Sequence, residues 1–131
     1  MARGRDAHQA RLQAVAGLGR LLARRARSKC EICECKGQRL TVIEVPPVDG
    51  APEADRAIMI CESCQRAVEG GKLDADHWRI LEGLVWSELP PVQVVAVRLT
   101  RRVRDDGVSW AGNALDGLYL EPDIEAWVDG A

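Results

Sequence analysis

Cys30-Glu-Ile-Cys-Glu-Cys35 and Cys61-Glu-Ser-Cys64 are the two stretches that decide the fold of this 131-residue chain. They contain all five cysteines and place two Cys-x-x-Cys pairs 27 residues apart. Two such pairs are typical of a structural zinc site, in which each tight turn supplies two thiolates and four thiolates complete a tetrahedron. The sequence therefore predicts one structural Zn²⁺ ion, with the ligands Cys30, Cys33, Cys61 and Cys64.

The fifth cysteine, Cys35, leaves an odd number, which favours metal binding over a full set of disulfide bonds. A redox-active Cys-x-x-Cys pair and an iron–sulfur cluster are alternative uses of the same residues, and the surrounding sequence favours neither. We expect Cys35 to be a free thiol beside the site, with a role as a substitute ligand as the alternative.

The segments around the cysteines predict the elements that carry them. Residues 39–45 and 57–60 are rich in β-branched and apolar residues and predict two short strands. Residues 61–69, followed by Gly70-Gly71, predict a short helix that opens with the second cysteine pair. A cysteine turn, two strands and a helix carrying the last two ligands form a treble clef, whereas a zinc ribbon would place both pairs on β-hairpins.

The remainder of the chain predicts helices. A first helix is expected over residues 6–27, with Leu12, Val15, Leu18, Leu21 and Leu22 near one face. Further helices are expected over residues 77–86, 91–104, 109–120 and 122–128. The sequence thus predicts a mostly helical α+β fold. It comprises a basic arm (residues 1–29), a zinc module (residues 30–71) and a helical region (residues 72–131), packed as one compact domain.

The four tryptophans have to supply the aromatic core, because the chain contains no Phe. Trp86, Trp110 and Trp127 are expected to be core residues. Trp78, next to His77, is expected to pack at the start of a helix, with a stacking surface for a base as the alternative.

The charge of the chain is strongly asymmetric. Residues 1–29 contain eight Lys and Arg and one Asp, a net charge of +7, and residues 30–131 carry −9. Such an arm can dock on the acidic body, stay solvated, or bind a nucleic acid or an acidic protein. The candidate contacts to such partners are Arg20, Arg24, Arg25, Arg27, Lys29, Arg98, Arg101 and Arg102. For the last three, a solvated helix face is the simpler interpretation.

The cysteine pairs stand among other distinctive strings: Glu44-Val-Pro-Pro47, Leu73-Asp-Ala-Asp-His-Trp78, Trp86-Ser-Glu-Leu-Pro-Pro-Val-Gln93 and Tyr119-Leu-Glu121. In this combination the chain resembles, over residues 21–127, the N-terminal zinc-binding region of PhnA-like proteins, which are named for an alkylphosphonate-utilisation operon. Members usually continue into a small β-barrel domain, which this chain is expected to lack. Cys35 stands where a glycine commonly follows the first zinc pair, so the resemblance implies a positive φ at this place.

These observations predict a zinc-stabilised, non-catalytic binding or adaptor protein with a protein partner, associated through the resemblance with phosphonate metabolism. An HNH-type nuclease would need a histidine at the end of the first strand, where the sequence has Glu44. The alternatives are a nucleic-acid-binding accessory protein that uses the basic arm and, more weakly, a phosphonate-related hydrolase. The chain contains no signal peptide pattern and no membrane-spanning run, so a cytoplasmic location is expected.

Overall fold

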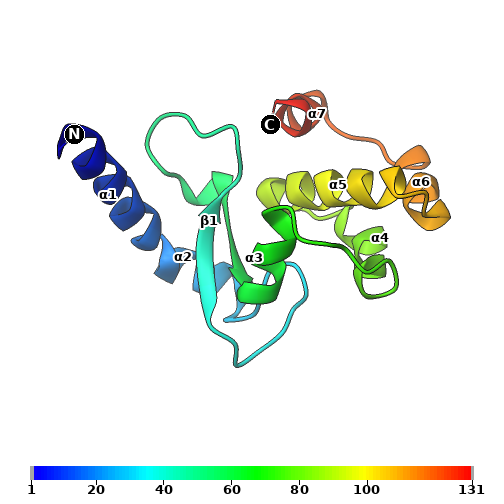
Figure 1. Ribbon diagram of the computed structural model, residues 1–131, viewed down its shortest axis with the longest axis horizontal. Coiled ribbons are helices and arrows are strands. Elements are labelled where there is room, and N and C mark those ends of the chain that lie inside the picture. The colour runs from blue at the N-terminus through cyan, green and yellow to red at the C-terminus, as the bar shows by residue number, and fades with distance from the viewer. Residues whose placement is uncertain (1, 131) are drawn as a thin grey trace.

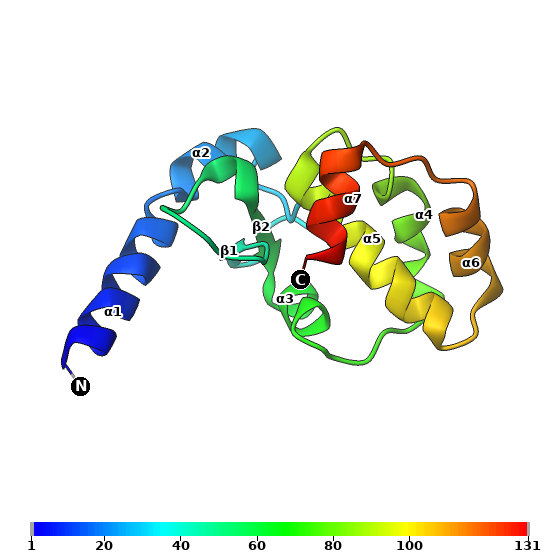
Figure 2. The same ribbon diagram turned by 90° about the horizontal axis from the view of Figure 1, so that it is seen from above.

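The computed structural model describes residues 2–130, which fold into a small antiparallel sheet surrounded by helices (Figures 1 and 2). The helix α1 lies at one end of the molecule, and α4, α5, α6 and α7 form a helical group at the other. The sheet, α2 and α3 lie between these ends, so the cysteine-bearing elements occupy the middle of the molecule. No helix in this described range is long and apolar enough to cross a membrane.

The basic arm forms two helices, α1 (Ala2–Ala16) and α2 (Gly19–Ala26). The prediction of one helix over residues 6–27 was therefore wrong at its centre, where Gly17 and Gly19 weaken the helix. The break turns Val15 and Leu22 toward the body, where both are buried, and leaves Leu12 50% exposed and Leu21 58% exposed. The predicted single apolar stripe is thus divided between two helix axes.

The sheet consists of β1 (Leu40–Glu44) and β2 (Ala57–Cys61), paired antiparallel with Leu40 opposite Cys61 and Glu44 opposite Ala57. A short 3₁₀ turn, η1 (Ala54–Arg56), leads into β2, and α3 (Glu62–Val68) follows it directly. Every residue of β2 is buried. Successive side chains of a strand point to opposite faces, so Ile58 and Ile60 enter the main core while Ala57 and Met59 pack with Leu22.

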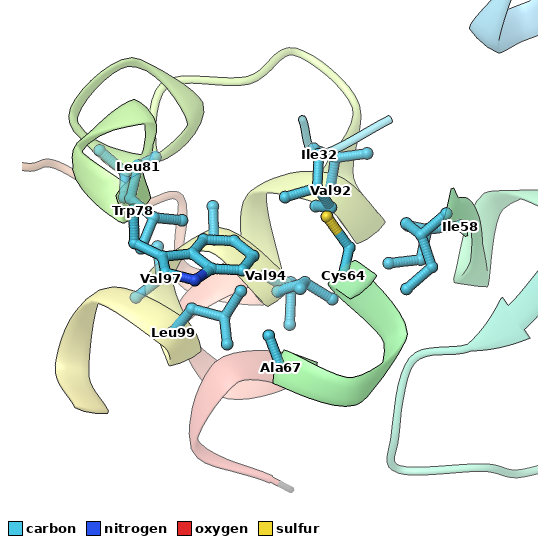
Figure 3. Packing of buried hydrophobic residues seen from close by; sticks show 14 of the residues in the cluster. Ile32, Ile58, Cys64, Ala67, Trp78, Leu81, Val92, Val94, Val97 and Leu99 are labelled. Carbon is cyan, nitrogen blue, oxygen red and sulfur yellow. The ribbon is translucent and has the colours of Figure 1, made fainter. Parts of the chain in front are cut away.

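The helix α5 (Pro90–Asp105) forms the centre of the helical group and contacts α4, α6 and α7. Val94 and Val97 are buried together with Val92, Val95 and Leu99 because neighbours cover α5 on several sides. Figure 3 shows this packing, with Val94, Val97 and Leu99 of α5 beside Trp78 and Ala67.

The helices predicted over residues 77–86 and 109–120 are shorter than expected, whereas the one predicted over residues 122–128 is one residue longer. Residues 77–86 form the 3₁₀ turn η2 (His77–Ile80) and the one-turn helix α4 (Leu81–Leu84). The last two helices are α6 (Ser109–Asp116) and α7 (Pro122–Asp129). Trp78 is 4% exposed, which confirms its packing role, whereas Trp86 is 55% exposed and the prediction that it is a core residue was wrong. Leu81 and Val85 fill the space beneath η2 and α4 instead.

Candidate metal centre

The first cysteine stretch forms a tight loop that folds back on itself. The Cys30 amide donates to the Cys35 carbonyl (3.1 Å), and the Glu34 amide donates to the Cys30 carbonyl (2.9 Å). Glu34 takes the left-handed conformation, with φ 62°. The positive φ expected at Cys35 is therefore found one residue earlier, because Glu34 is the residue at which the loop reverses. This reversal returns the Cys35 side chain toward Cys30 and Cys33.

The second cysteine stretch joins a strand to a helix. Cys61 is the last residue of β2 and the N-cap residue of α3, and Cys64 lies in the first turn of α3. Both side chains are buried. The strand pairing fixes the position of Cys61, because its partner in the register is Leu40 of β1.

Four thiols come together where these two stretches meet. The Sγ atoms of Cys30, Cys33, Cys35 and Cys61 all lie within 4.8 Å of one another. The Sγ atoms of Cys33 and Cys61 are 3.8 Å apart, far longer than the roughly 2.05 Å of a disulfide. Four sulfurs about 2.3 Å from a central ion at tetrahedral angles would be about 3.8 Å apart. The described residues contain no second group of this kind.

The fourth predicted ligand, Cys64, lies outside this group of four but next to Cys30. Cys64 is 1% exposed, and it packs in the core cluster that also contains Cys30. Figure 3 shows its sulfur pointing toward Ile32 and Val92, within the apolar core. The centre thus consists of five thiols, with Cys64 on the buried side and the half-buried Cys35 on the more open side.

The thiols of this centre differ in acidity. The hydrogen bond from Cys64 lowers the pKa of Cys30 to about 4, assisted by the backbone amide of Cys33 at 3.5 Å from its sulfur. Burial raises the pKa of Cys33 to about 12, and the bond to Cys30 raises the pKa of Cys64. One thiolate is therefore favoured at Cys30, and a bound cation would deprotonate its neighbours by direct ligation. The donor set fits a soft metal ion.

A buried ion pair ties the cysteine loop to the sheet. Arg25 of α2 binds both carboxylate oxygens of Glu31, at 2.7 Å and 2.8 Å, and donates to the carbonyls of Ala54 and Ala57. The Glu31 side chain is 3% exposed and also accepts the Met59 amide at 2.8 Å. Arg25, predicted as a contact to a nucleic acid or acidic partner, therefore positions the loop. Nothing in the spacing of Arg25 and Glu31 singled out this pair.

The predicted arginines of α5 also have internal partners. Arg98 donates to the carbonyls of Trp127 (2.6 Å) and Val128 (3.2 Å) at the end of α7, and Arg101 pairs with Asp129 at 2.8 Å. Arg102 donates to the carbonyls of Ala67 (2.5 Å) and Gly71 (2.6 Å) at the end of α3. These side chains hold helix C-termini in place, where both hydrogen bonding and the helix dipole favour a cation. A merely solvated face therefore does not describe Arg98, Arg101 and Arg102, and their contact with an external partner stays a prediction.

The remaining predicted cations lie on or just after α2. Arg20, Arg24 and Arg27 are exposed, and Lys29 is half-buried. Within residues 4–130, the ion pairs formed by arm residues are those of Arg11 with Glu44 and Arg25 with Glu31. Part of the arm therefore docks on the acidic body, as one of the alternatives predicted, and the other part faces solvent.

Comparison with known proteins adds no relative: no family model, curated protein or solved structure matches this chain. The resemblance to PhnA-like proteins stays a prediction that rests on the sequence strings quoted above.

Proposed function

We propose that this protein is a zinc-stabilised, non-catalytic binding or adaptor protein. The single observation that carries the proposal is the set of four thiols within 4.8 Å of one another at the junction of the cysteine loop, β2 and α3. Thiolates in tetrahedral arrangement are the ligands of structural Zn²⁺ sites, and a closed shell of four leaves no open position for a substrate. The order of cysteine loop, two strands and helix supports a treble clef as its architecture.

We further propose that the protein is PhnA-like, on the basis of its sequence resemblance. The resemblance to the PhnA N-terminal region supports an association with phosphonate metabolism, and the two cysteine strings of that resemblance lie in the loop and at the junction of β2 and α3. Metal analysis of the purified chain tests the zinc centre. One equivalent of zinc per chain would support the proposal, and a purified chain with no zinc and no affinity for added zinc would refute it.

A second candidate is a nucleic-acid-binding accessory protein, favoured by the outer face of α2. Arg20 and Arg24 are one helical turn apart and share the face opposite the buried Leu22, and the exposed Arg27 follows at the helix end. Three solvent-facing guanidiniums on and just after a short helix can contact backbone phosphates, and such contacts release counterions. This arginine face (Arg20, Arg24 and Arg27) is the part of the arm that docking on the body leaves available.

A salt-dependent binding titration separates the two candidates. The Arg20→Gln/Arg24→Gln/Arg27→Gln variant is compared with a control, Lys36→Gln/Arg39→Gln/Lys72→Gln, which removes the same charge from exposed positions elsewhere. For a nucleic-acid binder, the first variant lowers the slope of log K against log salt by about 2 to 3, and the control leaves the slope nearly unchanged. An equal decrease of the slope in both variants would show non-specific electrostatic attraction. If the unaltered chain binds no nucleic acid, the adaptor role is the remaining candidate.

A further inference from the structure

We propose that the metal centre has five thiols for four coordination positions, and that Cys35 and Cys64 are interchangeable fourth ligands. Cys30, Cys33 and Cys61 would bind the ion in both arrangements. This inference rests on the proposed zinc centre and goes beyond it, because it assigns a ligand role to Cys35 and predicts that the metal survives the loss of either fourth thiol.

The position of Cys35 follows from the backbone of the loop. The hydrogen bond from the Cys30 amide to the Cys35 carbonyl and the reversal at Glu34 hold Cys35 against the other thiols. Its Sγ atom already lies within 4.8 Å of those of Cys30, Cys33 and Cys61. Cys35 therefore completes a four-sulfur set without a change in the fold of the loop.

Cys64 reaches the centre from the opposite, buried side. It lies in the first turn of α3, three residues after Cys61, and packs in the same core cluster as Cys30 and Cys61. A neutral cysteine also packs as a small apolar side chain, so Cys64 fits the space beside Ile32 and Val92 when it is not a ligand. Cys64 can therefore leave the ion without leaving an unpaired charge in the core.

The exchange conserves atoms and charge. One Zn–S bond forms to the entering thiol and one breaks at the leaving thiolate, while the proton of the entering thiol is transferred to the leaving sulfur. The coordination number and the net charge of the centre stay the same. Because Cys35 is half-buried on the more open side, the arrangement that uses Cys64 leaves a free, partly accessible thiol at Cys35, and the arrangement that uses Cys35 leaves the free thiol at the buried Cys64.

The test compares Cys35→Ser, Cys64→Ser and the double variant, each loaded with Zn²⁺ for metal analysis and with Co²⁺ for its thiolate absorption band. We expect about one metal per chain in both single variants and at least a tenfold loss of affinity in the double variant. Loss of metal from one single variant only would show a fixed ligand and overturn the proposal. Full affinity in the double variant would overturn it too.

Two further measurements keep the test independent of folding. Cys64→Ala is measured beside Cys64→Ser, and far-UV circular dichroism reports whether each zinc-loaded variant is folded. Alkylation of Cys35 by iodoacetamide is then compared between the zinc-loaded unaltered chain and zinc-loaded Cys64→Ser or Cys64→Ala. We expect alkylation at least fivefold slower in the folded variant, where Cys35 is the permanent ligand, and equal rates would identify Cys35 as a bystander. An unaltered chain that binds no metal would instead refute the proposed zinc centre itself.

Discussion

Cys33 is one of three residues, with Cys30 and Cys61, that the proposed centre cannot replace, because all three belong to both proposed ligand sets. We expect Cys33→Ser to lower the zinc content from about one per chain to nearly zero and to lower the melting temperature to that of the chelated protein. Elemental analysis and thermal melting measure the two effects. Cys35→Ser is the matched control, since it removes a thiol from the same loop and should keep its zinc. A Cys33→Ser variant with full zinc content would show that Cys33 is not a ligand of the ion.

Arg25 is the second residue with a predicted effect of its own. Its side chain is the partner of Glu31, which is 3% exposed and would be left as an unpaired buried carboxylate in Arg25→Met. We expect the free energy of unfolding to fall by about 3 kcal/mol, measured by denaturant titration at constant zinc. Arg66→Met, which breaks the exposed pair of Arg66 with Glu62, should change it by less than about 0.5 kcal/mol. Similar losses of stability in the two variants would contradict a stabilising role of the ion pair between Arg25 and Glu31.

At the scale of elements, Arg102 is predicted to join α5 to α3. Its guanidinium donates to two carbonyls at the end of α3, and its removal leaves these acceptors without their charged donor. We expect Arg102→Met to reduce the free energy of unfolding by roughly 2 kcal/mol. Arg104→Met, on the same helix, removes an exposed side chain that pairs with the exposed Asp105 and should be nearly neutral. Chemical denaturation of both variants tests whether Arg102 stabilises the contact of α5 with α3. Equal stability of the two variants would contradict this role.

Gly71 marks the place where α3 ends and the chain passes close to its own backbone. A Cβ atom on Gly71 would lie 2.7 Å from the Arg66 carbonyl oxygen, so Gly71→Ala must displace the end of α3. Gly83 lies in α4 with nothing within 4 Å of such an atom, and Gly83→Ala should raise stability by about 0.5 to 1 kcal/mol. We expect opposite signs from the two substitutions in thermal melts. A stabilising Gly71→Ala would contradict the close approach.

At the scale of the whole molecule, metal removal should affect the middle of the chain most. A metal ion held by the thiols would cross-link the cysteine loop to β2 and α3, whereas α5 also packs on α6 and α7 through contacts that involve no thiol. We expect chelation to increase amide hydrogen exchange strongly in residues 30–71 and less in α5, as measured by mass spectrometry of peptic fragments. Reloading with zinc should restore protection. Unchanged exchange over residues 30–71 would contradict a structural role for the ion.

The periodicities of the sequence predicted the elements close to the centre well. The strands over residues 39–45 and 57–60 match β1 and β2 within one or two residues, because both are short apolar runs bounded by turn residues. The predicted helix boundaries were wrong where the helical pattern of the sequence was weak. Gly17 and Gly19 divided the predicted first helix, and residues 77–86 shortened to two single turns.

What the sequence determined by itself is the presence of clustered thiols, a small sheet and a mostly helical remainder, because cysteine spacing and hydrophobic period are local properties. Only the tertiary structure decided which thiols meet and what each arginine binds. The loop reversal at Glu34 brought Cys35 into the group of four, and the ends of α3 and α7 recruited Arg102 and Arg98. The contacts of Arg98 and Arg102 join residues 29 to 35 positions apart, and no local sequence pattern encodes a partner at that distance.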